Sequence, residues 1–160
     1  MSVRHGIGYD AHRLAAGRRL VLGGVELEHE RGLEGHSDAD VLVHAVIDAL
    51  LGAAGLDDIG THFPDDDETF RDADSLDLLR QVASLLDDRG LAVVHVDATV
   101  VAETPRIAPH RDAMRAALAF ALSVEPSAVN VKATRGEGMG FVGRGEGIAA
   151  LAVATVEAAV

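Results

Sequence analysis

Residues 36–55 read HSDADVLVHAVIDALLGAAG, and this stretch predicts the main helix of the protein. Apolar residues recur in it at the spacing of a helix that packs on a core. Ser37 with Asp38 is the predicted N-cap, and Gly52 or Gly55 is the predicted end. The fold is therefore expected to form around this helix.

Three polar side chains interrupt the apolar pattern of this helix. Asp40, His44 and Asp48 follow one another at intervals of four residues, so they form one stripe on the helix surface. His44 lies among apolar residues, which is unfavourable unless its imidazole is bonded. Taken alone, a buried helical histidine is more often a satisfied core residue than a metal ligand.

A second polar pair comes near the start of the chain, where residues 8–14 read GYDAHRL. Residues 3–9 predict the first strand, and on a strand residues two apart project from the same face, so Asp10 and His12 can converge on one point. This pair alone is also weak, because aspartate is common in turns. Together with His44, two imidazoles and a carboxylate suit Zn²⁺ with one coordination position left open, as in catalytic sites.

The remaining segments read alternately as strands and helices. Residues 19–28 predict two short strands joined at Gly23-Gly24, a hairpin signal. Ser75 and Gly90 are the expected limits of a second helix. The other predicted elements are a loop at 58–74, strands at 91–103, 128–135 and 147–160, and a helix at 109–124.

These elements predict an α/β (α+β) fold in one domain, residues 1–160. We expect a mixed sheet of mostly four strands, with helices packed on one face, and a small separate hairpin. The last strand, residues 147–160, is apolar on both faces. Because few helices are available to cover it, one face is expected to be buried by another subunit.

Composition limits the classes of partner and location. The chain has 160 residues, enough for a real core, and its formal net charge of −12 argues against nucleic acid. No apolar run approaches the ~20 residues that a membrane span requires, and no secretory signal is apparent, so we expect no membrane partner and a cytoplasmic location. The chain has no cysteine, which excludes thiolate metal sites. An anionic ligand would need concentrated positive charge or metal ions.

Motifs along nearly the whole chain resemble those of one enzyme family. They are GYDAHRL, LGG, GLEGHSDADVLVHAVIDALLGAAGLDDIGTHFPD, ADS, PRIAPH, VNVKAT and GFVGRGEGIAA. The combination resembles the 2-C-methyl-D-erythritol 2,4-cyclodiphosphate synthase family of non-mevalonate isoprenoid biosynthesis. The resemblance implies a phosphorus–oxygen lyase that converts 4-diphosphocytidyl-2-C-methyl-D-erythritol 2-phosphate to the 2,4-cyclodiphosphate and CMP.

The resemblance also implies two metal sites. Asp10, His12 and His44 would bind zinc or another divalent transition metal. Glu137 matches the ligand of a second metal, Mg²⁺ or Mn²⁺, which is shared with the substrate phosphates.

The substrate-binding positions follow from the same resemblance. His36 and Ser37 would line the site beside Asp10 and His12, and His36 is also a catalytic candidate. The positions for the methylerythritol part are Asp58, Ile59, Gly60, Phe63, Pro64, Asp65, Asp66 and Asp67. Those for the cytidine diphosphate are Ala102, Pro105, Arg106, Ile107, Ala108, Ala133, Thr134, Arg135, Gly136 and Glu137, and two further positions are Phe141 and Arg144.

The implied chemistry fits these residues. The 2-phosphate of the substrate attacks its own β-phosphorus, and CMP leaves. A phosphate monoester is largely ionised at neutral pH, with a second pKa near ~6, so no strong general base is needed. The transfer requires positioning and cancellation of charge, which divalent metals would supply.

Family members are homotrimers with active sites between subunits, and the apolar last strand fits such an assembly. Arg144 and Glu146 match residues near an axial cavity that holds isoprenoid-like ligands in some members. The alternative for these two residues is a turn with a surface ion pair.

This chain departs from the family pattern at two places. Where the family has three threonines before the acid, the chain reads Thr134, Arg135, Gly136, Glu137. Arg135 replaces a threonine that is counted as a transition-state stabiliser, and is therefore the second catalytic candidate; we expect it to contact the α- or β-phosphate, the alternative being a solvent-exposed side chain. Arg106 replaces the usual lysine, which keeps the charge but changes its shape.

The sequence is also compatible with two other functions. One is a zinc-dependent phosphohydrolase that uses the same three ligands with a metal-bound water. The other is a non-catalytic trimeric module that binds isoprenoid phosphates through Arg144.

Overall fold

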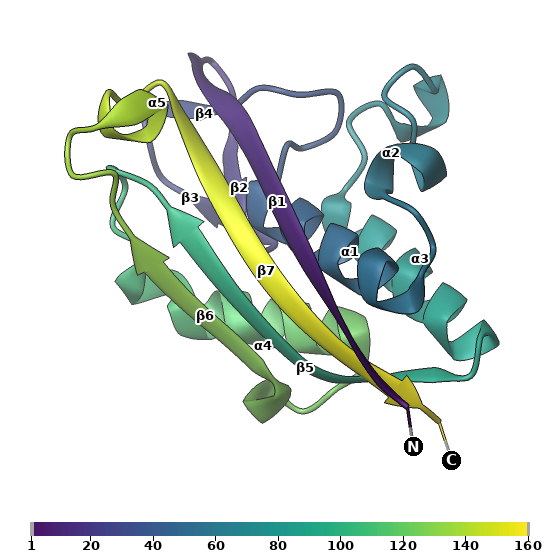
Figure 1. The fold of residues 1–160 in the computed structure, drawn as a ribbon. Coiled ribbons are helices and arrows are strands. Elements are labelled where there is room, and N and C mark those ends of the chain that lie inside the picture. The colour runs from purple at the N-terminus through teal and green to yellow at the C-terminus, as the bar shows by residue number, and fades with distance from the viewer. Residues whose placement is uncertain (1, 160) are drawn as a thin grey trace.

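A five-stranded mixed sheet forms the frame of the protein, for which a computed structural model describes residues 2–159. The strands lie in the order β4-β1-β7-β5-β6 (Figure 1). Only β5 and β6 are parallel neighbours; the other pairs are antiparallel. The bounds are β1 Val3–Ala16, β4 Arg31–Leu33, β5 Leu91–Val101, β6 Val129–Thr134 and β7 Gly147–Ala158. The predicted mixed sheet is confirmed, with the three-residue β4 added to the four expected strands.

The long helices all pack on one face of this sheet (Figure 1). They are α1 Val41–Ala54, α3 Ser75–Asp88 and α4 Arg111–Leu122. On β7, Ala152 and Ala154 face the helices and are buried, whereas Leu151 and Val153, which alternate with them, are 39% and 46% exposed. The sheet therefore has one covered face and one open apolar face. None of the helices in the described part of the chain is long and apolar enough to span a membrane.

The predicted hairpin is present as β2 Leu20–Leu22 and β3 Val25–Leu27. Gly23 and Gly24 form its turn with φ angles of 58° and 74°, the left-handed region that glycine adopts without strain. Both glycine N–H groups donate to the buried carboxylate of Asp40, at 2.9 and 2.7 Å. The same carboxylate accepts the Val43 N–H and is the N-cap of α1. The prediction of Ser37 with Asp38 as the cap was therefore wrong.

Other boundaries also differ from the predictions. β1 continues to Ala16 because it pairs with β7 as far as Arg13 and then with β4, so Asp10 and His12 lie within the strand. Asp74, and not Ser75, caps α3. The predicted loop at 58–74 contains the short helix α2 (Ile59–His62) and a 3₁₀ turn, and the turn before β7 contains α5 (Gly140–Gly143).

The backbones of β1 and α1 lie in direct contact. A Cβ atom at Gly8 would lie 1.9 Å from the Ala45 carbonyl oxygen, and one at Gly6 would lie 2.0 Å from the Ala49 carbonyl oxygen. Real Cβ atoms do not approach other atoms so closely. Glycine on the strand is therefore needed for this approach to the helix backbone.

Replacement of Gly8 by alanine tests this contact. The added methyl group would force α1 away from β1. We expect Gly8→Ala to lower the free energy of unfolding by about 1–3 kcal/mol, the usual range for overpacking in a core, as measured by urea denaturation.

The matched control is Gly52→Ala on the facing helix. The nearest atom that a Cβ atom at Gly52 would meet across the contact is the Gly6 Cα, at 3.9 Å. Alanine favours a helix over glycine by about 1 kcal/mol, so this variant should keep or gain stability. Equal losses in the two variants would contradict close contact as the cause.

Candidate active site

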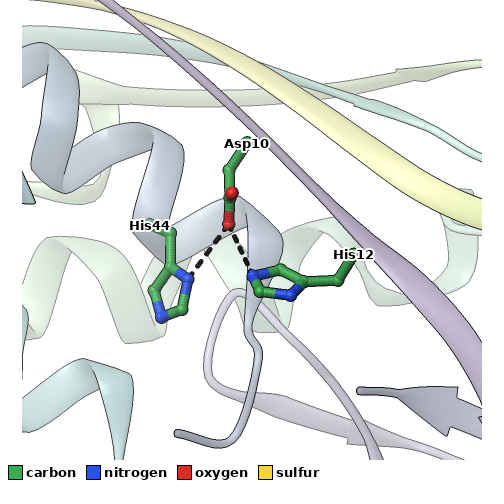
Figure 2. A group of neighbouring side chains, drawn as sticks. All are labelled: Asp10, His12 and His44. Carbon is green, nitrogen blue, oxygen red and sulfur yellow. Dashed lines mark hydrogen bonds and ion pairs between the residues drawn. The ribbon is translucent and has the colours of Figure 1, made fainter. Parts of the chain in front are cut away.

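Asp10, His12 and His44 meet at one point between β1 and α1 (Figure 2). The Asp10 Oδ2 atom lies 2.9 Å from His12 Nε2 and 3.0 Å from His44 Nδ1. One donor atom from each residue lies within 4.8 Å of the other two. The three residues predicted from the sequence as metal ligands are therefore brought together. They are the one group of this kind among the described residues.

The charges at this point favour a bound cation. Burial opposes ionisation of Asp10, but hydrogen bonds with His12 and His44 outweigh burial and lower its pKa from 3.8 to about 2. Burial also disfavours a charged His12, but the hydrogen bond and the charge of Asp10 raise the pKa of His12 above its usual 6.5. A carboxylate that favours a positive charge on the neighbouring His12 ring also favours a divalent cation at the same point.

The donor set also fits a metal because the outer ring nitrogens are occupied. His12 Nδ1 lies 2.9 Å from the Glu34 carbonyl oxygen, and His44 Nε2 lies 2.8 Å from Ser75 Oγ. Metal-binding histidines usually donate their second N–H to such acceptors. Two imidazoles and one carboxylate, with a cavity beside them, match a zinc site with an open position.

A cavity of about 230 Å³ opens beside the three residues. Predicted substrate residues that line it are Asp10, His12, His36, Ser37, Ile59, Gly60, Phe63 and Asp65. Four others lie outside this lining: Asp58, Pro64, Asp66 and Asp67. Of these, Asp58 caps α2 by accepting the Thr61 N–H, and the Asp67 carbonyl lies 2.9 Å from His36 Nε2.

A second cavity, of about 320 Å³, lies between the loop after β5 and the end of β6. The predicted nucleotide residues that line it are Ala102, Pro105, Arg106, Ile107, Ala108, Ala133, Thr134 and Arg135. Neither cavity is lined by Gly136, Glu137, Phe141 or Arg144. Glu137 is exposed, and Arg144 pairs with Glu146 at 3.1 Å, the surface ion pair that the sequence left open. The two cavities have no lining residue in common.

Arg135 lies at the rim of the second cavity and is largely exposed. Its guanidinium donates to Glu103 Oε2 at 3.2 Å, and Glu103 Oε1 accepts the Gly136 N–H at 2.5 Å. Desolvation opposes ionisation of Glu103, but the N–H of Gly136 and the charge of Arg135 lower its pKa. Glu103 lies in the 102–108 loop that was expected to receive the cytidine diphosphate, but it was not singled out as a site residue.

Three more residues next to the site were missed as site residues. Ser75 contacts His44, Asp38 accepts the Ser75 N–H at 2.9 Å, and Asp48 accepts the Ile59 N–H at 3.0 Å. In the sequence Ser75 and Asp38 have the pattern of helix caps, and Asp48 is one member of a polar stripe. The ADS motif that contains Ser75 was the one available signal.

The chain matches known proteins in sequence and in fold. Residues 3–157 match the model of the YgbB family. The 2-C-methyl-D-erythritol 2,4-cyclodiphosphate synthase of Symbiobacterium thermophilum is 62% identical over 151 residues, which cover 94% of this chain and 96% of that protein. The bifunctional enzyme IspD/IspF of Desulforudis audaxviator is also 62% identical over 151 residues, but this chain spans only 38% of its length.

A solved structure shows the same fold. The IspF of Plasmodium falciparum, in a complex with CDP, superimposes with a TM-score of 0.87 at 29% sequence identity, over 99% of this chain and 98% of that one. The match to the family over nearly all residues is thus supported by sequence and by structure. The chain belongs to the YgbB family, that of the 2-C-methyl-D-erythritol 2,4-cyclodiphosphate synthases which its sequence resembles.

Proposed function

We propose that the protein is a 2-C-methyl-D-erythritol 2,4-cyclodiphosphate synthase, a phosphorus–oxygen lyase of non-mevalonate isoprenoid biosynthesis. In this reaction an oxygen of the substrate 2-phosphate forms a bond to the β-phosphorus, and the bond from that phosphorus to the oxygen bridging to CMP breaks. The observation that carries the proposal is the convergence of Asp10, His12 and His44 beside a cavity, in a chain of this family.

The attacking phosphate needs no strong general base, because it is largely ionised at neutral pH. The protein therefore contributes mainly by positioning the 2-phosphate of the substrate in line with the β-phosphorus that it attacks. The first cavity, with His36, Ser37 and residues 58–67, would hold the methylerythritol part. Residues 102–108 and 133–137, around the second cavity, would hold the cytidine diphosphate.

Asp10, His12 and His44 would hold zinc or a similar ion, and Glu137 a second ion, Mg²⁺ or Mn²⁺, with the substrate phosphates. Bound divalent metals supply Lewis-acid stabilisation of negative charge on phosphate oxygens. The lining of the first cavity supports a metal there, because it includes Asp48 and Asp65 but neither lysine nor arginine. Apart from its histidines, this cavity offers a phosphate group no basic side chain.

A homotrimer with sites between subunits completes the proposal. In one chain the two cavities have separate linings, so a neighbouring chain would bring its second cavity beside the first. The open sheet face, where Ile7 and Tyr9 are 70% and 55% exposed, supplies an apolar surface for such contacts. The proposal keeps the cytoplasmic location expected from the sequence, and an isoprenoid-like ligand near Arg144 at the trimer axis.

An activity assay in ¹⁸O-water tests the function against its two rivals. With the cytidine diphosphate substrate, zinc and Mg²⁺, we expect the cyclic diphosphate and CMP, identified by ³¹P NMR, without solvent oxygen in either product. A phosphohydrolase would incorporate ¹⁸O. A binding module would give no turnover at all.

Replacement of His44 by alanine tests the metal site. The variant removes one of three ligands, so we expect it to lose bound zinc in elemental analysis while the fold and assembly persist. His110→Ala, the same change at a histidine that lines neither cavity, should keep zinc at the wild-type level. Full zinc occupancy in His44→Ala would refute the assignment.

Replacement of Val153 by glutamate tests the trimer. Val153 lies on the open sheet face, and a buried carboxylate there would prevent association. We expect sedimentation to give the mass of three chains for the wild type and of one chain for Val153→Glu, with loss of activity. Phe120→Glu, at an exposed position on α4 over the other face, should remain trimeric. An active wild-type monomer would rule out the arrangement.

Replacement of Arg135 tests whether its side chain contacts the phosphates. Its exposed pair with Glu103 is weak enough to be exchanged for a phosphate contact. We expect Arg135→Ala to lower kcat/KM at least tenfold, about 1.4 kcal/mol, and Arg135→Thr to recover part of the loss.

Glu103→Gln separates phosphate binding from an indirect role of Arg135 through Glu103. It keeps a side-chain oxygen for the Gly136 N–H but removes the charge that pairs with Arg135. If Arg135 contacts phosphate, this variant should keep most activity. If Glu103→Gln reproduces the defect of Arg135→Ala, or Arg135→Ala is fully active, the phosphate contact is wrong.

A further inference from the structure

A buried polar chain lies behind His44, on the side of the ring away from Asp10. Ser75, the first residue of α3, is fully buried, and its Oγ lies 2.8 Å from His44 Nε2. The same hydroxyl is hydrogen-bonded to Asp38 Oδ1, while Asp38 Oδ2 accepts the Ser75 N–H at 2.9 Å. Three residues from two parts of the chain, the start of α1 and the start of α3, are thus linked in series: Asp38, Ser75 and His44.

The direction of the protons in this series follows from the donors available. Both carboxylate oxygens of Asp38 accept backbone N–H groups, from Ser75 and Asp40, so Asp38 acts as the acceptor and the single proton of the Ser75 hydroxyl is donated to it. The Ser75 oxygen then has only lone pairs to offer to His44 Nε2, which must carry a hydrogen to bond with it. The neutral ring is thereby left with its lone pair on Nδ1, the atom that lies 3.0 Å from Asp10 Oδ2.

The other tautomer would close the metal site. A hydrogen on Nδ1 would be donated to Asp10, so that one ligand atom is blocked and the carboxylate is engaged. Nothing on the Asp10 side opposes this arrangement, because Oδ2 is a good acceptor. Ser37 Oγ also approaches His44 Nε2, but at 3.3 Å, so this contact is longer and weaker than that of Ser75 whichever way its proton points. Ser75 is therefore the main contact that favours the open tautomer.

We propose that Ser75 and Asp38 are positioning residues that fix His44 in the Nε2–H tautomer, with Nδ1 free to bind a metal ion. This inference rests on the proposed metal-binding role of Asp10, His12 and His44 and deepens it. Neither residue lines the cavity beside the triad, so neither is placed to touch the substrate. Their effect reaches the reaction only through the orientation and protonation of His44.

Two variants separate this role from simple packing. Ser75→Ala removes the hydroxyl and leaves a void no larger than one oxygen atom. Asp38→Asn has nearly the same shape as the wild type, but replaces one acceptor oxygen with a donor; where the amide nitrogen faces the Ser75 hydroxyl, it reverses the direction of that hydrogen bond, and where it faces the Ser75 N–H, that bond is lost. Ser84→Ala is the matched control, because Ser84 is an exposed serine on the same helix.

The first readout is the zinc dissociation constant, measured by competition with a chelator. We expect Ser75→Ala and Asp38→Asn to bind zinc about 10- to 100-fold more weakly than the wild type, the usual effect of losing the partner of a metal-bound histidine. Ser84→Ala should bind zinc like the wild type. Wild-type affinity in Ser75→Ala and in Asp38→Asn would overturn the inference.

The second readout is the tautomer of His44 in the metal-free protein, measured by ¹⁵N NMR at a pH where the ring is neutral. We expect the Nε2–H form in the wild type and a shift towards Nδ1–H in Asp38→Asn. A wild type in the Nδ1–H form would overturn the inference, even if Ser75→Ala should fail to fold. This measurement needs no metal. If the wild type binds no zinc, the proposed function is refuted. The tautomer measurement still decides whether Ser75 fixes the ring of His44 in that case.

Discussion

Direct contact between the backbones of β1 and α1 fixes the distance between the two elements that carry the candidate metal ligands. Gly6 and Gly8 face the helix from the strand, and Ala45 and Ala49 face them from α1. Asp10 and His12 continue the same face of β1, since they follow the glycines at intervals of two. His44 precedes Ala45, so its side chain meets Asp10 only while the backbones stay in contact. Metal–ligand distances of about 2.0–2.2 Å tolerate little displacement of either element.

The short segment before α1 secures the helix from its other end. Asp40 accepts N–H groups from the hairpin turn and from the first turn of the helix, and Asp38 accepts from the start of α3. Burial raises the pKa of Asp40, and its bonds to Gly24, Val43 and Gly23 counter that effect. In the described residues no buried side-chain nitrogen or oxygen lacks a hydrogen-bond partner. The position of His44 along the sheet is thus determined by polar contacts, and its distance from the sheet by close packing.

The sequence was sufficient for the parts of the site that depend on local geometry. The two-residue period of a strand predicted that Asp10 and His12 project from the same face of β1. The polar stripe on the helix identified His44 as the third candidate ligand, and the three residues do lie together. Ser75 could not be assigned in this way, because its contact with His44 spans 31 positions and a serine before a helix usually reads as a cap.

Local patterns also failed where tertiary pairing decides the boundary. β1 extends beyond its apolar start because β7 and β4 both pair with it, which no local pattern reveals. The N-cap of α1 is Asp40, whereas Ser37 with Asp38 was predicted, because the N–H groups of Gly23 and Gly24, from a distant turn, need a buried acceptor. In both cases the deciding partner is far away along the chain.

Electrostatics explains why the proposed substrate would need both a metal and a second chain. The chain carries a formal net charge of −12, and the cavity beside the triad is lined by carboxylates without lysine or arginine. The second cavity offers Arg106 and Arg135, although Glu103 offsets one of these charges. A ligand with a phosphate at one end and a nucleoside diphosphate at the other would meet no lysine or arginine in the first cavity, whose basic side chains are histidines, and would be only partly neutralised by the second. Cations held by the triad would supply the missing charge, and association through the open sheet face would bring the arginines of one chain to the cations of the next.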